Sequence, residues 1–243
     1  MIETLGGGKK IYDIHDKSKF DSMITEKELN HRGIGKLYTP HRNPWSQIWN
    51  DWQRDHKKFM DNVKEFNIVV QAGGCFGMYP ALYGTYFNEV YTFEPDPLNF
   101  YCLDKNCQGD KFHKYEGGLG NSNRGDWMLN HLENAGGHYL THYEIGDVKK
   151  GRLEASGKPG TVQMYKLDDL DLPALDLIHL DTEGSGSIDA IVMGGYETIK
   201  KYLPVIVTEW GGGNLENKLT NLGYIEKYVH HKDTKMDSVF VVQ

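Results

Sequence analysis

Hydrophobic and polar positions divide the chain near residue 67 into two parts of different character. From Ile68 onward, short apolar runs alternate with helical patterns, which predicts βαβ units and a parallel sheet. The pattern places five such strands at residues 68–72, 90–93, 112–115, 175–180 and 205–208. Residues 224–229 and 238–242 follow as two adjacent strands around a polar turn, and we expect them to form an antiparallel pair at one edge of the sheet.

Two segments depart from this alternation. Residues 1–66 are predicted to form a helical extension on a core domain of residues 67–243. The clearest element of this extension begins at Asn43-Pro44, a favourable N-cap followed by a first-turn proline. Apolar residues then recur at helical spacing to Val63, typical of a helix packed on the sheet; a partner-docking face or a lid is the alternative. Residues 121–174 are predicted to form a β-rich insertion, either facing the substrate or decorating the surface.

Composition narrows the classes of protein that the chain can represent. Its 243 residues suit one domain. The formal net charge is -7 and the sequence has no basic stripe, so we expect no nucleic-acid partner. No apolar run reaches about 18 residues, which argues against a membrane span. The three cysteines, Cys75, Cys102 and Cys107, form no CxxC pair. A reducing compartment, the cytoplasm, is therefore expected.

Glycines and carboxylates follow the predicted strands, where an open parallel sheet binds its ligands. The segments concerned are 73–77, Glu94, 116–120, 181–184 and Glu209, and none of them contains a lysine or arginine. A phosphate-rich ligand requires cations together with backbone amides. The acidic segments instead favour a ligand that carries ribose hydroxyls and positive charge.

Glu94 stands about 20 residues after Gly73, the separation at which an acid reaches the ribose of an adenosine-containing cofactor. A carboxylate accepts hydrogen bonds from two vicinal hydroxyls. Glycines in the preceding turn let the backbone approach a ligand closely. The full Gly-x-Gly-x-x-Gly pattern is absent, which disfavours the alternative of a nicotinamide-dependent oxidoreductase.

Three stretches carry a family resemblance. Residues 69–77 read VVQAGGCFG, residues 90–99 read VYTFEPDPLN and residues 176–184 read DLIHLDTEG. Shorter matches are LG at 119–120, LDDL at 167–170 and PVIVTE at 204–209. Between about Ile68 and Trp210, the chain resembles the FkbM-type methyltransferase family.

The resemblance implies a Rossmann-like class I methyltransferase fold, with a mostly parallel seven-stranded sheet, helices on both faces and an antiparallel C-terminal edge strand. It implies S-adenosylmethionine as cofactor and a hydroxyl of a small molecule or carbohydrate as methyl acceptor. By position, the implied cofactor-binding residues are Gln71, Gly73, Gly74, Cys75, Gly77, Glu94, Pro95, Asp96, Asn99, Glu116, Gly117, Gly118 and Asp181.

For a hydroxyl acceptor, the protein must align the substrates and take a proton. We expect Asp181 or Glu183 to be the base, assisted by His179 if its ring reaches the strand end; the alternative for His179 is a core position. No metal is expected, although Asp181, Glu183 and Glu209 leave a metal-dependent variant open. The family usually has an acid at Gln71 and an asparagine at Cys75. A second hypothesis is therefore a catalytically inactive cofactor-binding or assembly protein on the same fold.

Overall fold

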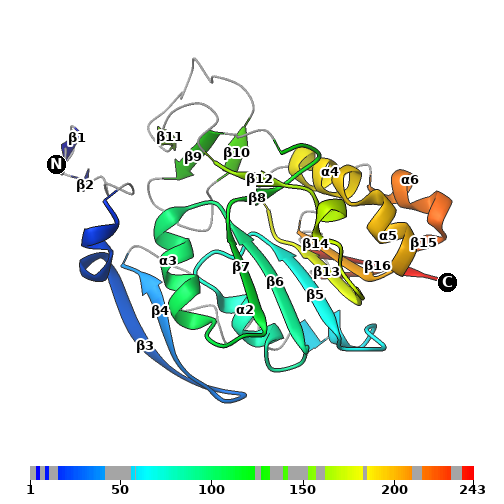
Figure 1. Ribbon diagram of the computed structural model, residues 1–243, viewed down its shortest axis with the longest axis horizontal. Coiled ribbons are helices and arrows are strands. Elements are labelled where there is room, and N and C mark those ends of the chain that lie inside the picture. Colours follow the sequence, from blue (N-terminus) through cyan, green and yellow to red (C-terminus); the bar gives the residue numbers. More distant parts are fainter. Residues whose placement is uncertain are drawn as a thin grey trace.

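A seven-stranded sheet forms the centre of the computed structural model (Figure 1). The structure describes residues 4–5, 9–10, 16–41, 56–57, 59–123, 127–131, 139–141, 153–156, 162–182, 185–209, 215–230 and 237–243. The strands lie in the order β15-β16-β14-β13-β5-β6-β7. Their bounds are β5 (Ile68–Ala72), β6 (Glu89–Glu94), β7 (Phe112–Glu116), β13 (Leu177–Leu180), β14 (Val205–Glu209), β15 (Tyr224–His230) and β16 (Asp237–Val242).

The chain starts the sheet at its centre and builds outward in both directions. Neighbouring strands from β7 to β14 pair in parallel, and β5 pairs with both β6 and β13. The expected antiparallel strand is β16, which pairs with β14 on one side and β15 on the other. β16 therefore lies between β14 and the edge strand β15. The chain forms the edge strand β15 first and then returns to place β16 between β15 and β14. The predicted Rossmann-like fold with a mostly parallel seven-stranded sheet is confirmed, with this correction to the position of the antiparallel strand.

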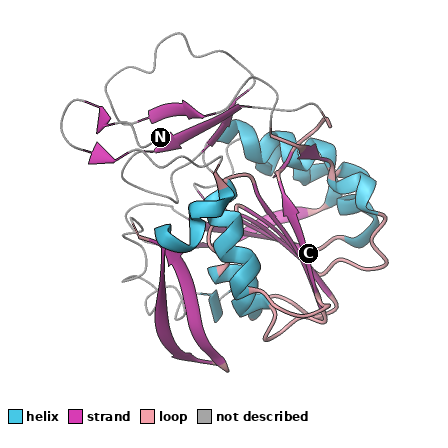
Figure 2. Cartoon of the chain, turned by 60° about the vertical axis from the view of Figure 1, so that its left-hand side comes forward, coloured by secondary structure: helices cyan, strands magenta, loops and turns pink. Residues whose placement is uncertain are grey.

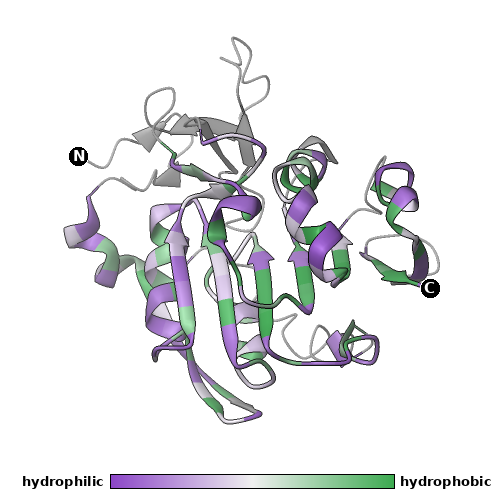
Figure 3. Ribbon diagram, turned by 45° about the vertical axis from the view of Figure 1, so that its right-hand side comes forward, coloured by the Kyte–Doolittle hydropathy of each residue, from purple (hydrophilic) through white to green (hydrophobic). Residues whose placement is uncertain are grey.

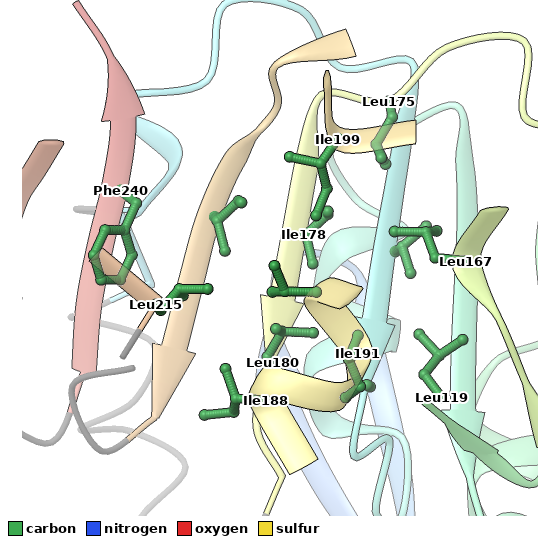
Figure 4. Packing of buried hydrophobic residues seen from close by; sticks show 14 of the residues in the cluster. Leu119, Leu167, Leu175, Ile178, Leu180, Ile188, Ile191, Ile199, Leu215 and Phe240 are labelled. Atoms are coloured by element: carbon green, nitrogen blue, oxygen red, sulfur yellow. The ribbon is translucent and has the colours of Figure 1, made fainter. Parts of the chain in front are cut away.

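Helices cover both faces of the sheet because its strands are apolar on both sides (Figure 3). On one face, α4 (Ser185–Gly194), α5 (Tyr196–Tyr202) and α6 (Leu215–Leu219) pack on Ile178, Leu180 and Ile206 (Figure 4). On the other face, α2 (Met78–Tyr83) packs on the sheet through Tyr83. Helix α3 (Pro97–Asn106) lies beside α2 and contacts β6 and β7.

The described part of the N-terminal extension is mainly a β-hairpin. A 3-10 helix, η1 (Lys17–Met23), precedes β3 (Ile24–His31) and β4 (Ile34–Pro40), which pair in antiparallel fashion. Arg32 and Gly33 join the strands with φ of 45° and 84°, the positive values of a type I′ turn. The expectation of a helical extension is wrong for residues 24–40, because an Arg-Gly turn and a buried β4 face on α3 favour a hairpin.

The predicted aromatic helix lies partly outside the described residues, which omit 42–55 and Lys58. His56, Lys57, Phe59 and Met60 are helical, and Phe59, Met60 and Val63 are buried against the α2 face of the sheet. This end of the predicted helix therefore packs on the core. Two short strands, β1 (Thr4–Leu5) and β2 (Lys9–Lys10), pair with each other near the N-terminus.

Short strands occur within residues 121–174. An antiparallel sheet has β9 (Trp127–His131) at its centre, between β10 (Tyr139–Thr141) and β11 (Leu153–Ser156). β12 (Met164–Tyr165) pairs in parallel with β8 (Gly118–Leu119), which directly follows β7. Two 3-10 helices complete the described elements: η3 (Leu167–Leu170) and η5 (Thr220–Leu222). Among the described residues, no helix has the length and apolarity needed to cross a membrane.

Candidate cofactor-binding site

The segments that follow β5, β6 and β13 meet at the carboxyl edge of the sheet. The backbone N–H of Asp181 donates to the carbonyl of Ala72 over 3.0 Å. Those of Gly73 and Gly74 donate to the carbonyl of Phe93, over 3.1 and 2.9 Å. Three predicted site segments, far apart in sequence, are thus joined directly by backbone hydrogen bonds at the switch point of the sheet.

Gly73 is required by the close approach of the chain to itself. Its φ is +81°, and a Cβ there would lie 1.8 Å from the carbonyl oxygen of Asp181. Gly74 and Gly77 face α3 instead: added Cβ atoms would lie 2.4 Å from Leu103 Cδ1 and 2.9 Å from Leu103 Cα, respectively. The sequence suggested that these glycines admit a ligand. In the structure, the space that a Cβ would occupy at each of the three is limited by neighbouring protein atoms.

Glu94 links the turn after β5 to the turn after β6. Its side chain is buried, with the residue 5% exposed, at the carboxyl end of β6. Oε2 accepts a hydrogen bond from the backbone N–H of Cys75 over 2.6 Å, and Oε1 accepts one from that of Asp96 over 2.8 Å. Two charge-assisted hydrogen bonds to backbone groups therefore fix the orientation of this carboxylate.

Cys75 occupies a strained position in a negatively charged environment. Its φ is +46°, in the left-handed region that side chains other than glycine and asparagine rarely adopt. Burial raises the pKa of its thiol well above the usual value, and the nearby carboxylates of Glu94, Asp181 and Asp96 raise it further. The thiol is therefore protonated at neutral pH, and the turn lies among three acids.

Gln71 lies beneath the turn, fully buried in β5. Its Nε2 donates to the carbonyls of Ala72 and Gly73, over 3.1 and 2.8 Å. Its Oε1 accepts a hydrogen bond from the Thr92 hydroxyl over 2.8 Å. Through these contacts, the Gln71 side chain supports the backbone of the turn. Thr92 was not among the predicted site residues, although a polar side chain within an apolar strand indicated such a role.

Asp96 and Asn99 shape the start of α3. Asp96 Oδ1 accepts hydrogen bonds from the backbone N–H groups of Leu98 and Asn99, over 2.9 and 2.8 Å. With Pro97 as the first helical residue, Asp96 is a typical N-cap. Asn99 is buried in the first turn of the helix, and Pro95 is half-buried between Glu94 and the cap.

Glu116 lies beside Glu94, its partner in the parallel register of β6 and β7. Its carboxylate pairs with Lys17 of η1, whose Nζ lies 2.7 and 2.9 Å from the two oxygens. Gly117 donates to the carbonyl of Glu94 over 3.0 Å, and a Cβ on it would lie 2.4 Å from the carbonyl oxygen of Gln163. Gly118 pairs with Met164. No sequence signal pointed to Lys17, which is 99 positions from Glu116.

His179 points into the core on the α2 face. It is 2% exposed, and its Nδ1 lies 2.7 Å from the hydroxyl oxygen of Tyr83. The ring of Tyr79 meets it edge-on, with centroids 4.5 Å apart. Burial lowers the pKa of His179 to about 3, so the ring is neutral at physiological pH. Of the alternatives for this residue, the structure shows the core position.

Asp181 is half-buried directly after β13. The pKa of the Tyr83 hydroxyl is raised well above its usual value by burial and then by the negative charges of Asp181 and Asp237. Glu209 ends β14 and pairs in register with Asp237. Glu183 lies outside the described residues. Within the described part of the chain, no group of three or more His, Cys, Asp or Glu side chains is arranged to hold a metal ion.

Comparison with known proteins gives similarity at the level of structure alone. No family model matches the sequence, and no curated protein matches it. The structure is similar to that of methyltransferase FkbM from Methylobacillus flagellatus KT, with a TM-score of 0.46 and 16% identity. That alignment covers 72% of this chain, and the chain spans 43% of the length of that protein.

Two further structures are also similar. M. jannaschii TYW2, in complex with AdoMet, has a TM-score of 0.47 at 12% identity, over 91% of this chain and 87% of the other. The tRNA (uracil-54, C5)-methyltransferase of Pyrococcus abyssi, in complex with S-adenosyl-L-homocysteine, has a TM-score of 0.48 at 10% identity. This last alignment covers 90% of this chain and 44% of the other.

Proposed function

We propose that this protein is an S-adenosylmethionine-dependent methyltransferase. The observation that supports the proposal most strongly is the link between Glu94 and the glycine turn. A buried carboxylate at the end of β6 is oriented by the amide of Cys75, in the turn that follows the central strand β5. In sheets of this type, an acid at this position holds ribose hydroxyls and the first turn contacts the remainder of the cofactor.

The charge of the turn fits such a cofactor. S-adenosylmethionine supplies a methyl group activated by a positively charged sulfonium, and it also carries an ammonium group. Glu94, Asp96 and Asp181 all act on the Cys75 thiol, so their negative charge is concentrated at the turn. The segments at the strand ends contain no lysine or arginine that would favour the phosphates of a dinucleotide. This electrostatic preference supports the sulfonium cofactor over NAD.

We assign cofactor contacts to the turn at Gly73–Gly77, to Glu94 for the ribose and to the segment at Glu116 for the base. A carboxylate offers about four acceptor positions, so hydrogen bonds from backbone amides are compatible with hydroxyl donors. In this proposal, Asp96 and Gln71 act through the backbone segments that they hold, and Asn99 acts as part of the helix turn that Asp96 caps. The hydrogen bonds described for Gln71, Asp96 and Asn99 join them to other groups of the protein.

For the transfer step, we propose that a hydroxyl of a small molecule or carbohydrate is the acceptor and that Asp181 takes its proton. Asp181 is half-buried and stands at the strand end, with its backbone against Gly73. A carboxylate in this position can orient the acceptor hydroxyl and remove its proton as the new bond forms. Glu183 is the second candidate for the base. His179 takes no direct part, because its ring lies in the core.

Calorimetry on the purified full chain tests the proposal. We expect S-adenosylmethionine and S-adenosylhomocysteine to bind and NAD to show no binding. Glu94→Gln should weaken binding of S-adenosylhomocysteine by at least about tenfold, or 1.4 kcal/mol. Glu89→Gln is the matched control: Glu89 begins the same strand, and its carboxylate contacts His113 and Tyr91. This control variant should bind like the wild type.

Three results would contradict the proposal in different ways. Wild-type protein that binds neither form of the cofactor would remove its basis. Preferred binding of NAD would instead support an oxidoreductase. Tight cofactor binding with no methyl transfer to any member of a broad panel of hydroxyl acceptors would favour the non-catalytic alternative.

A further inference from the structure

Asn106 joins three parts of the molecule through one side chain. It is the last residue of α3. Its Nδ2 donates to the carbonyl of Tyr38 in β4 over 2.7 Å and to the carbonyl of Phe76 in the turn over 2.6 Å. Its Oδ1 accepts from the backbone N–H of Tyr38 over 2.7 Å. The amide thus binds the N-terminal hairpin on one side and the turn after β5 on the other.

The surroundings of Asn106 hold the hairpin, α3 and the turn in one packed unit. Leu37 of β4, Phe76 of the turn and Cys102 of α3 belong to one buried apolar cluster, together with residues of α2. Figure 2 shows the hairpin extended beside the helices of this face. Gly77 packs so closely on α3 that an added Cβ would lie 3.4 Å from Asn106 Cβ. The end of α3 that carries Asn106 therefore lies directly against the turn.

The turn requires support because Cys75 is left-handed. For a residue with a Cβ, this conformation costs about 1–2 kcal/mol, so neighbouring contacts have to maintain it. Glu94 holds the N–H of Cys75 on one side. Asn106 holds the carbonyl of Phe76, the next residue, on the other. The Cys75–Phe76 segment is thus held at both ends.

We propose that Asn106 is a positioning residue for cofactor binding and that it makes the N-terminal hairpin part of the binding machinery. This inference rests on the proposed function. Asn106 contacts the backbone of the turn and acts on the cofactor through the Cys75–Phe76 segment. Because the same side chain holds β4, cofactor binding and docking of β4 are linked, and each strengthens the other by the same factor.

Two variants test the proposal in calorimetry with S-adenosylhomocysteine. Asn106→Asp keeps the shape and the acceptor for Tyr38 N–H, but it places a carboxylate oxygen against two carbonyls. We expect its Kd to rise at least tenfold. Asp104→Asn is the matched control: Asp104 lies two residues earlier in α3, and its Oδ1 accepts a hydrogen bond from Lys114 Nζ of β7 over 2.5 Å. Its Kd should stay within twofold of wild type.

Hydrogen exchange on the wild type tests the linkage without any variant. Saturating S-adenosylhomocysteine should slow exchange in the peptide that contains Tyr38 and leave the peptide at the Arg32-Gly33 turn unchanged. Equal Kd values for wild type and Asn106→Asp, or unchanged exchange at Tyr38, would overturn the role of Asn106 while leaving the proposed function intact. Wild-type protein without measurable binding would instead overturn both.

Discussion

The hydroxyl oxygen of Tyr83 and Nδ1 of His179 lie 2.7 Å apart in the fully buried space between α2 and the sheet. Tyr79 and Phe59 complete the aromatic surroundings of the imidazole, with ring centroids 4.5 and 5.8 Å away. Burial lowers the pKa of His179 to about 3 and raises that of Tyr83 well above its usual range. The pair is therefore neutral in the native protein and satisfies two polar groups inside an apolar cluster.

This neutrality predicts a pH dependence of stability. In the unfolded chain, His179 has its ordinary pKa near 6.5, so between pH 6.5 and about 3 the unfolded state binds more protons than the native state. The free energy of unfolding should therefore fall as pH falls through this window, by up to about 1.4 kcal/mol per pH unit. Urea unfolding from pH 7 to 4 measures it. The slope should flatten in His179→Gln and persist in Tyr83→Phe, which keeps the imidazole; equal slopes for His179→Gln and wild type would contradict the assignment.

The conformation of Cys75 predicts a stabilising substitution. Because φ is +46°, Cys75→Asn places a residue that tolerates the left-handed region where a thiol now stands. We expect the free energy of unfolding to rise by up to about 1 kcal/mol, which is part of the cost of a left-handed residue with a Cβ. Cys75→Val should lower it, since a β-branched side chain fits this region poorly. Thermal unfolding of the two variants beside wild type provides the measurement, and the opposite order would show that the strain is located elsewhere.

Gly73 and Gly33 form a matched pair for separating strain from crowding. Both have positive φ, +81° and +84°. A Cβ on Gly73 would lie 1.8 Å from the Asp181 carbonyl oxygen, whereas a Cβ on Gly33 would have no neighbouring atom within 4 Å. Gly33→Ala should cost about 1 kcal/mol from backbone conformation alone. Gly73→Ala should cost clearly more and should displace the Asp181 segment. Comparable losses in chemical denaturation would mean that the contact between these segments relaxes easily.

Asp181→Asn tests the proposed proton acceptor. The amide retains the size of the side chain but cannot take a proton, so methyl transfer to an accepted hydroxyl substrate should fall by at least about 100-fold. The Kd for S-adenosylhomocysteine should change by less than about threefold, because the backbone of Asp181 keeps its hydrogen bond to Ala72. Turnover at the wild-type rate would remove Asp181 from the mechanism and direct attention to Glu183.

The sequence predicted the sheet because alternating apolar runs of strand length require burial on both faces. It also located the segments after β5, β6, β7 and β13, since the carboxyl ends of parallel strands share one edge. It failed for residues 24–40, where the hairpin depends on packing against α3 and the local pattern is mixed. Likewise, periodicity could not tell whether His179 faces the core or the strand end.

The order of residues alone determined which groups stand at the edge of the sheet: the glycine turn at 73–77, the acid Glu94 and the acid Asp181. These follow from strand periodicity, which is a local property. Only the tertiary structure decided what each group contacts. Glu94 meets the Cys75 amide, Asn106 joins β4 to the turn, and His179 turns into the aromatic core. Such contacts join residues distant in sequence, and their geometry is fixed by packing of the whole chain.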